Sequence, residues 1–164
     1  MRPASVGGFP PLCTEGWWPY AGHCYSIQRE SKAWKDALFS CKSQDGDLAS
    51  VHSIAEYSFL VKSFSFHASE PTEELWLGLN DLKAHFYFEW SDGTPVTFTT
   101  WQCRHPTYRN GLEDCVVMKG QVKLCSHFIE MQTNNCLRLK SCAAIYLFRS
   151  LFYLILETNL ASIR

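Results

Sequence analysis

The sequence predicts an α+β domain that combines two helices, several short antiparallel strands and disulfide bonds. Two segments show helical periodicity, and several short apolar runs are bounded by turn residues in the manner of strands. The 164 residues include eight cysteines, a high number for a chain of this length. None of them forms a Cys-x-x-Cys pair. A disulfide framework in an oxidising compartment is therefore favoured over a zinc ribbon or a thioredoxin-like redox site.

The N-terminal part predicts a short hairpin after a leader. Residues 1–12 carry three prolines and two glycines, which is typical of a flexible leader or linker. Cys13 and Cys24 then enclose two tryptophans and a turn at Gly22. This spacing suits two short strands closed by one disulfide.

The first predicted helix covers about 31–43. Ser31 is of the residue type that caps helix N-termini. Apolar side chains then recur at helical spacing on one face: Trp34, Leu38 and Cys41.

The second predicted helix covers about 54–65 and follows Ser53. Glu56 stands three residues after that serine, so the pair fits a capping box in which each side chain satisfies a backbone amide. The remaining apolar runs are interpreted as strands at 48–51, 75–79, 86–90, 96–100 and 115–118, and the intervening 67–74 and 102–112 as loops.

The character of the sequence changes after Gly120. Residues 121–142 contain three cysteines and no tryptophan, and residues 143–156 are nearly all apolar. Because Arg149 interrupts this run, and because it is shorter than the roughly 20 residues that cross a bilayer, a membrane span is disfavoured. A core helix, an interfacial helix and unselected sequence remain the alternatives.

Composition excludes several functional classes. The chain is 46% hydrophobic and 15% aromatic with a formal net charge of −1, which suits one packed domain and offers no basic patch for nucleic acid. No nucleophile–base–acid arrangement and no phosphate-binding loop is visible, so the chain is expected not to be an enzyme. Residues 1–12 lack the apolar segment of a signal peptide. A disulfide domain without an export signal suggests a piece of a larger secreted or membrane protein, or an incomplete gene product.

Five motifs carry a resemblance to a known family. They read GWWPYAGHCY, GDLASVHS, ELWLGLND, FEWSDGTPVTFT and EDCVVMKG, and all lie within residues 13–120. Together they resemble a C-type lectin-like domain of the macrophage mannose receptor family, and most closely its first lectin domain. Such receptors carry several of these domains outside the cell on one membrane anchor and take up glycoproteins. The resemblance implies a C-type lectin-like fold for residues 13–120.

The resemblance also allows the sugar site to be checked. The family holds calcium with a Glu-Pro-Asn loop, a later glutamate and a Trp-Asn-Asp strand, and the calcium binds vicinal sugar hydroxyls. His105, Pro106 and Thr107 stand at the loop motif, where Pro106 implies a cis peptide, and Glu113 matches the glutamate. Imidazole is a poor ligand for a hard cation. No tryptophan follows Trp101, so the Trp-Asn-Asp strand is expected to be absent. Neither a metal nor another cofactor is therefore expected, and calcium is disfavoured.

The resemblance implies a disulfide pattern that the tail does not reproduce. Cys13 pairs with Cys24 in the family, and Cys41 and Cys115 pair with two cysteines near the end of the domain. Cys136 and Cys142 lack the family spacing and the aromatic strand between them, and Cys103 and Cys125 have no family counterpart. Cys41 and Cys115 are thus expected to stay unpaired, next to a sheet with an open edge.

The expected organisation is a leader or linker at 1–12, a partial lectin-like domain at 13–120 and a non-matching tail at 121–164. Gln121-Val122-Lys123 could be encoded by a splice-donor sequence, which suggests that the tail is intron read-through.

The leading hypothesis is a carbohydrate-recognition-type binding module of an endocytic receptor ectodomain, outside the cell and without calcium-dependent sugar binding. Its partners would be a glycan or glycoprotein and neighbouring lectin domains, and not nucleic acid. The alternative is a truncated or aberrant product without binding activity of its own.

Simpler structural roles are favoured over functional ones at several positions. Three tryptophans could form a ligand-stacking platform but are expected in the core: Trp76, Trp90 and Trp101. His105 beside Cys103 is interpreted as an exposed histidine and not as a catalytic dyad. Asn80-Asp81 is interpreted as a turn, and Glu113-Asp114 as a polar pair before a disulfide.

Overall fold

The computed structural model describes residues 13–65, 74–102, 104–107, 111–119, 130–134, 136 and 140–147, and all structural statements below concern these residues. They form two helices and eight strands. In chain order these are β1 (Trp18–Tyr20), β2 (His23–Lys32), α1 (Trp34–Lys42), β3 (Asp47–Leu48), α2 (Ile54–Ser65), β4 (Glu74–Asn80), β5 (Glu89–Trp90), β6 (Cys115–Lys119), β7 (Glu130–Asn134) and β8 (Lys140–Leu147).

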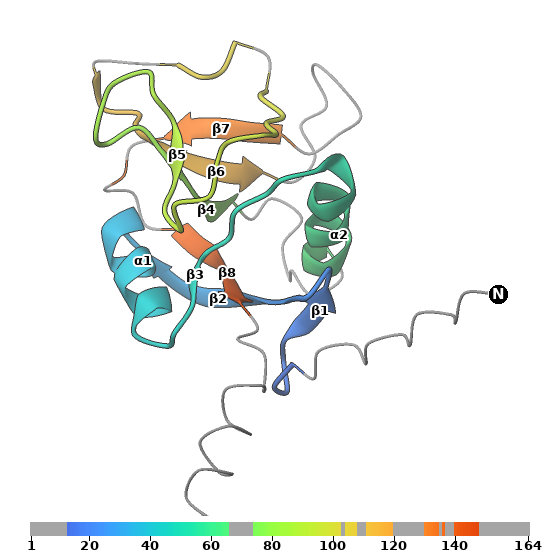
Figure 1. The fold of residues 1–164 in the computed structure, drawn as a ribbon. Helices are drawn as coiled ribbons and strands as arrows, with labels where there is room; N and C mark the ends of the chain where they lie inside the picture. The colour runs from blue at the N-terminus through green and yellow to red at the C-terminus, as the bar shows by residue number, and fades with distance from the viewer. Residues whose placement is uncertain are drawn as a thin grey trace, which may run out of the picture.

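One mixed sheet organises the molecule. Its strand order is β1-β2-β8-β4-β6-β7, with β3 paired to β8 and β5 paired to β4. Neighbouring strands are antiparallel except β4 and β8, which run parallel through Leu75↔Ser141 and Trp76↔Cys142. Figure 1 shows the two helices on opposite sides of the molecule, α1 against β3, β4 and β8, and α2 beside β1. The architecture is therefore the predicted α+β arrangement of two helices and short, mostly antiparallel strands.

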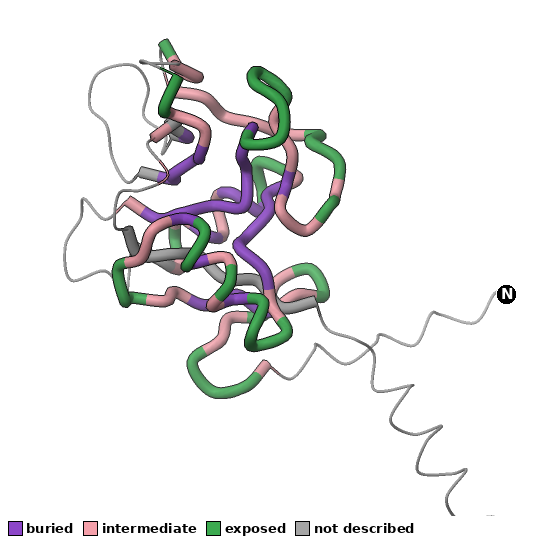
Figure 2. Tube along the Cα trace, turned by 90° about the vertical axis from the view of Figure 1, so that its left-hand side faces the viewer, coloured by how far each residue is buried: buried purple, intermediate pink, exposed green. Residues whose placement is uncertain are grey.

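The core follows the central strands. Leu75, Leu77 and Leu79 of β4 are buried with residues of α2 and β6, and Trp76 on the other face of β4 packs with α1 residues. The buried stretches run through the middle of the chain trace in Figure 2. Trp76 and Trp90 are 0% and 1% exposed, so their assignment to the core is confirmed, and the half-buried Trp101 packs against the same core.

Helix α2 has the predicted bounds and a modified cap. The amide of Glu56 donates to the Ser53 hydroxyl at 3.1 Å, which confirms half of the capping box. The Glu56 carboxylate instead accepts the amide of His52 at 2.7 Å and the hydroxyl of Tyr25 at 2.5 Å. Burial and then the contact with Glu56 raise the pKa of Tyr25 far above its usual range, so its hydroxyl stays protonated and ties β2 to α2.

The predicted cap of α1 is wrong. The helix begins at Trp34, its N-cap residue is Ala33, and no side chain caps it. Ser31 belongs to β2, because that strand continues to Lys32 and pairs there with Lys140 of β8. A long-range strand pairing has overridden the local cap preference of a serine.

Several predicted strands are shorter than expected or absent. Of the predicted 48–51 strand only Leu48 is strand, as the end of β3; of 86–90 only 89–90 is strand, and 96–100 forms no strand. Phe86 adopts a left-handed φ of 72° and is 65% exposed, which breaks the extended pattern before β5. The predicted loop 67–74 lies almost entirely outside the described residues.

Two strands of the sheet come from residues beyond Gly120. β7 pairs with β6 along its whole length, and β8 lies between β2 and β4 in the middle of the sheet. Residues 143–147 are thus strand, where a helix or unselected sequence was expected. The remainder of that apolar run, with Arg149, lies outside the described residues.

Disulfides close both ends of this arrangement. Cys13 is bonded to Cys24, the pair that the family resemblance implies. Cys115 is bonded to Cys136, so the prediction that Cys115 stays unpaired is wrong, because β7 carries the chain back alongside β6. Cys41 is buried on α1. Within the described segments, neither helix combines the length and the apolar composition that a membrane-spanning helix needs.

Candidate functional site

The loop that corresponds to the Glu-Pro-Asn motif retains its backbone geometry. The His105–Pro106 peptide is cis, as the family resemblance implies. The amide of His105 donates to the carbonyl of Gln102 at 2.8 Å, and the amide of Gln102 donates to the carbonyl of Met131 on β7 at 3.0 Å. The loop is therefore anchored to the sheet through backbone hydrogen bonds. His105 is half-buried, which corrects the expectation of an exposed imidazole.

One side chain of this loop contacts the glutamate that matches the family pattern. The Thr107 hydroxyl donates to the Glu113 carboxylate, and both residues are half-buried. The loop thus offers an imidazole and a hydroxyl at the positions where the family has a carboxylate and an amide. Calcium takes six to eight oxygen ligands. The loop offers one carboxylate, and that carboxylate already accepts a hydrogen bond from a hydroxyl. This falls well short of such a set.

A strand does lie beside the loop, which corrects the expectation that it would be absent. β7 contacts the segment before the loop through the bridge between Trp101 and Met131. In sequence, β7 carries Met131-Gln132-Thr133, which includes no tryptophan, asparagine or aspartate. The backbone element is therefore retained, and the Trp-Asn-Asp residues that would ligate calcium are replaced.

A second group of potential metal ligands includes Asp114, which directly follows Glu113 in the sequence. Asp81, His85 and Asp114 each bring one ligand atom to within 4.8 Å of the others. The Nδ1 atom of His85 lies 4.0 Å from Oδ2 of Asp81 and 3.5 Å from Oδ1 of Asp114. The amide of Asp81 donates to the carbonyl of Asp114 at 3.0 Å, which fixes the end of β4 against the start of β6.

The electrostatics of this group are unbalanced. The side chain of Asp81 is fully buried, and its Oδ2 accepts the amide of Phe86 at 2.9 Å. Burial raises the pKa of Asp81, the hydrogen bond from Phe86 opposes this, and the nearby charge of Asp114 raises it further. Oδ1 of Asp81 is buried without a hydrogen-bond donor among the described residues, whereas Oδ1 of Asp114 faces Nδ1 of His85 at 3.5 Å. One carboxylate oxygen of this group is thus left without a donor.

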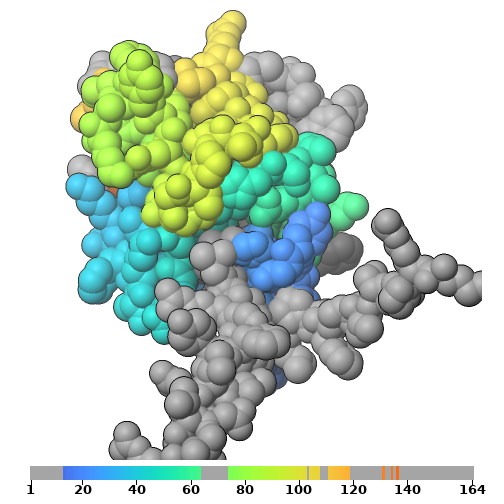
Figure 3. Space-filling model, viewed as in Figure 1, coloured from blue at the N-terminus to red at the C-terminus, as the bar shows by residue number. Residues whose placement is uncertain are grey.

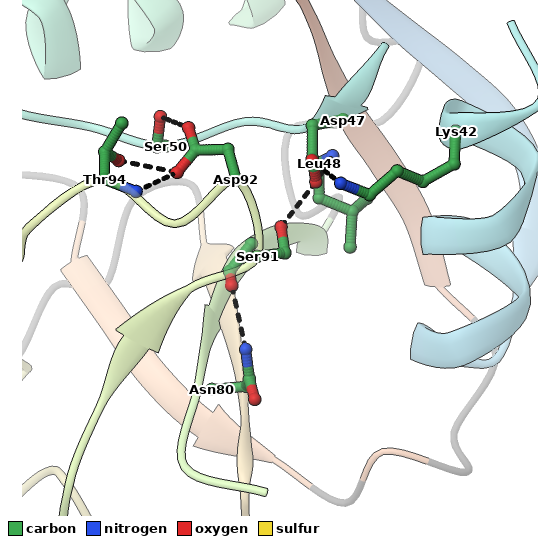
Figure 4. Close-up of polar contacts among 9 residues, drawn as sticks. Lys42, Asp47, Leu48, Ser50, Asn80, Ser91, Asp92 and Thr94 are labelled. Atoms are coloured by element: carbon green, nitrogen blue, oxygen red, sulfur yellow. Dashed lines mark hydrogen bonds and ion pairs between the residues drawn. The ribbon is translucent and has the colours of Figure 1, made fainter. Parts of the chain in front are cut away.

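Two other carboxylates, of the buried Asp47 and the half-buried Asp92, have structural roles. In Figure 4, the turn that begins at Ser91 is fastened to the segment after α1 by Asp47 and Asp92. The hydroxyl of Ser91 donates to Asp47 at 2.6 Å, while Asp92 accepts the hydroxyls of Ser50 and Thr94, each at 2.6 Å. Burial on its own would raise the pKa of Asp92, but these hydrogen bonds outweigh it and lower the pKa.

The nearby histidine does not turn this network into a catalytic triad. Nε2 of His52 lies 3.2 Å from the hydroxyls of both Ser50 and Thr94. However, Asp92 contacts the two hydroxyls and not the imidazole, and Ser50 is only 2% exposed. A serine nucleophile needs a base that a third group orients, as well as access to substrate. The network instead holds the turn after β5 in place.

The comparison with protein families decides the classification. The sequence profile described as "Lectin C-type domain" matches residues 30–143. The chain belongs to the C-type lectin domain family. The matched region crosses Gly120 and includes β7 and the first half of β8.

Among the relatives, the mannose receptor group stands out. C-type mannose receptor 2 of Homo sapiens is 45% identical over 109 residues, which cover 66% of this chain and 7% of the receptor. The chain is therefore a C-type lectin-like domain of the mannose receptor family, and it spans a small fraction of the length of that relative.

Solved C-type lectins share the fold. The lectin CEL-I from Cucumaria echinata is 25% identical with a TM-score of 0.75, and the alignment covers 82% of this chain and 97% of CEL-I. The carbohydrate-recognition domain of cow CD23, solved in the presence of a GlcNAc2Man3 oligosaccharide, is 28% identical with a TM-score of 0.70, covering 83% and 96%. Calcium-dependent and calcium-independent type II antifreeze proteins have the same fold at a TM-score of 0.68 each. The C-type lectin fold therefore exists both with and without dependence on calcium.

The structure brings the predicted site residues of this C-type lectin domain together only in part. Thr107 and Glu113 are in contact, and the cis peptide places His105 and Pro106 in the same loop. Sequence reasoning missed the group of Asp81, His85 and Asp114. The i,i+4 spacing of Asp81 and His85 was a visible signal, but Asp114 joins them only because β4 pairs with β6.

Proposed function

We propose that this C-type lectin domain is a non-enzymatic binding module of a mannose-receptor-like endocytic receptor and lies outside the cell. We further propose that the cis-proline loop holds no calcium, so that the domain binds its glycan or glycoprotein ligand without this ion. The relatives named above are receptors and lectins, and the disulfides Cys13–Cys24 and Cys115–Cys136 suit an oxidising compartment.

The contact between Thr107 and Glu113 carries this proposal. In a calcium-dependent site the glutamate must offer its oxygens to the ion and to the sugar. Here a neighbouring hydroxyl already donates to that carboxylate, while His105 provides imidazole and β7 carries Met131-Gln132-Thr133 in place of Trp-Asn-Asp. Since imidazole and hydroxyl groups are weak ligands for a hard cation, calcium gains too little at this loop to become dehydrated.

The structure argues against the alternative of an aberrant product. Residues 130–134 and 140–147 complete the sheet, and Cys136 closes a disulfide with Cys115. Unselected sequence is not expected to form β8 beside β4 and β7 beside β6. Nor is it expected to place Cys136 within bonding distance of Cys115. The binding-module proposal therefore takes precedence.

Calorimetry tests the proposal. Methyl mannoside is titrated into the oxidised 164-residue chain in calcium and again in EDTA, with a calcium-dependent mannose-binding lectin as the positive control. We expect no EDTA-sensitive heat from this chain. An EDTA-sensitive, sub-millimolar association would contradict the proposal.

A restoration variant makes the test sharper. The double variant His105→Glu/Thr107→Asn rebuilds the loop motif beside Glu113 without changing the strand. We expect that it still fails to bind mannoside with calcium, because Met131-Gln132-Thr133 of β7 stands in place of the Trp-Asn-Asp motif. Calcium-dependent binding by this variant would show that the strand residues are dispensable and that the argument from ligand number is wrong.

A further inference from the structure

We propose that the loop between β4 and β5 binds an uncharged oligosaccharide by stacking sugar rings on its exposed aromatic side chains. The contact surface is an aromatic patch that consists of Leu82, Phe86 and Tyr87. The inference rests on the proposed function, because a domain that binds a glycan without calcium needs another source of affinity. The aromatic patch supplies it.

The aromatic patch concentrates apolar side chains at the surface. Leu82 is 39% exposed, Phe86 65% and Tyr87 77%, and every residue from 82 to 87 is exposed. The yellow-green atoms of this segment lie at the upper left of the face in Figure 3. Single exposed apolar residues are normal, whereas several on one loop mark an interaction surface. The other large apolar side chains that are exposed in the described segments are spread along the sequence: Phe39, Ile54, Val96 and Leu112.

Hydrogen bonds hold this loop in shape before a ligand arrives. The pairing of β4 with β5 closes its base. The amide of Phe86 donates to Oδ2 of Asp81 at 2.9 Å, and the amide of Tyr87 donates to the carbonyl of Ala84 at 3.0 Å. A surface that is already ordered loses less conformational entropy on binding, so weak stacking contacts become sufficient.

The backbone of Phe86 is strained in a way that its exposure does not explain. Its φ of 72° lies in the left-handed region, which favours glycine and disfavours a bulky side chain. With 65% of its surface in water, the ring gains little from burial to offset this strain. Strained residues of this kind gather at ligand-binding positions. The phenylalanine is therefore better explained by an external contact than by stability.

The charges around the aromatic patch favour an uncharged ligand. Nζ of Lys83 pairs with Oε1 of Glu89 at 2.5 Å, and Nδ1 of His85 lies 3.5 Å from Oδ1 of Asp114. The two basic groups thus each face a carboxylate. The rim has no excess of positive charge that would attract a phosphate, a sulfate or a nucleic acid.

The same groups suit a sugar. A pyranose ring has a face of C–H groups that stacks on the electron-rich face of an aromatic ring. Its hydroxyls then need hydrogen-bonding partners at the edge of that contact. Lys83 and Glu89 are 79% and 40% exposed, and His85 is 56% exposed, so donors and acceptors surround the aromatic patch. An uncharged oligosaccharide satisfies both requirements.

Saturation-transfer NMR with GlcNAc2Man3 oligosaccharide and the oxidised 164-residue chain tests this inference. We expect an association that is unchanged by EDTA. Tyr87→Ala and Phe86→Gly should each weaken it at least fivefold, whereas Tyr87→Phe keeps the ring and should stay within twofold of wild type. Phe39→Ala is the matched control, because it removes a ring that is 76% exposed on α1, and it should leave binding unchanged.

Thermal melts separate a lost contact from a lost fold. Tyr87→Ala should melt within a few degrees of wild type, because the side chain is mostly in water. Phe86→Gly should do the same, since glycine accepts the left-handed φ without strain. Weaker binding by variants that melt normally would therefore assign the loss to the rings themselves.

Three results would overturn the inference. The first is an EDTA-resistant association that is equally strong in Tyr87→Ala, which leaves the proposed function intact. The second is an absence of binding at millimolar oligosaccharide. The third is a concentration-dependent dimer that Tyr87→Ala abolishes in sedimentation experiments, since it assigns the aromatic patch to a second copy of the chain. An association that EDTA removes would instead contradict the proposed function.

Discussion

Gly78 in β4 has no room for a side chain. Its amide donates to the carbonyl of Ala49, and its carbonyl accepts the amide of Ser91, each at 3.0 Å. A Cβ atom at this position would lie 2.5 Å from Oγ of Ser91 and 3.0 Å from the carbonyl oxygen of Leu48. Gly78→Ala therefore forces movement of both neighbours. The Ser91 hydroxyl can rotate, but the Leu48 carbonyl belongs to the backbone of β3.

The cost has two parts. Overpacking a filled core costs about 1–3 kcal/mol. Rotation of the Ser91 hydroxyl also breaks its 2.6 Å hydrogen bond to Asp47, whose Oδ1 keeps the amide of Leu48 as a donor; a lost hydrogen bond to a charged group costs about 1.5–3 kcal/mol. We therefore expect Gly78→Ala to lower the free energy of unfolding by about 2.5–6 kcal/mol.

Urea denaturation followed by tryptophan fluorescence measures this change. Gly16→Ala is the matched control, because Gly16 has a φ of 83° with no atom within 4 Å of a Cβ, so it should cost only the backbone strain of about 1–2 kcal/mol. If the Ser91 contact dominates, Gly78→Ala/Ser91→Ala should be less destabilised than the sum of the two single variants. A Gly78→Ala protein within 0.5 kcal/mol of wild type would refute the packing argument.

Three further predictions concern the cap, the second disulfide and acid stability. Ser53→Ala should lower the free energy of unfolding by about 1 kcal/mol because it removes the α2 cap. Ser31→Ala should change it by less than about 0.5 kcal/mol, and thermal melts compare the two variants. Replacing Cys115 and Cys136 together by alanine opens a loop with a sequence separation of 21, and urea melts should show a loss of about 3 kcal/mol; an unchanged midpoint would contradict the bond. Because the folded-state pKa of Asp92 is lowered, its contribution is present above about pH 4 and is lost as the pH falls through the folded value. Asp92→Asn should therefore be less stable than wild type at pH 7, with a difference that shrinks below about pH 4, as unfolding curves across pH would show.

Elements defined by local pattern were predictable, and elements defined by distant partners were not. Helix α2 follows from its apolar periodicity and from Ser53, and both lie within one short segment. The end of β2 does not, because Ser31 has the side chain of a cap and becomes strand only through β8, more than a hundred residues later. The same reason explains β8 itself, whose apolar sequence fits a buried strand and a buried helix equally well.

The candidate site divides in the same way. The substitutions at His105 and Thr107 and the retained Glu113 could be read directly from the motif, because the loop is contiguous in sequence. The metal-ligand group could not, since Asp114 reaches Asp81 only through the pairing of β4 with β6. In Figure 3, the yellow-green to yellow atoms of residues 81–102 cover much of the upper part of the face in view.

On the proposal that this domain binds without calcium, its fold and its calcium chemistry are separable because they depend on different residues. Trp76, Leu77 and Trp90, which lie in the shared motifs, are almost fully buried and hold β4 and β5 in the core. His105 and Thr107 lie outside both core clusters, so their exchange changes the ligands without opening a cavity. A sequence can therefore keep the lectin motifs and the cis-proline loop while it loses the calcium ligands. The motifs consequently predict the fold, whereas the ligand must be inferred from the loop and strand residues themselves.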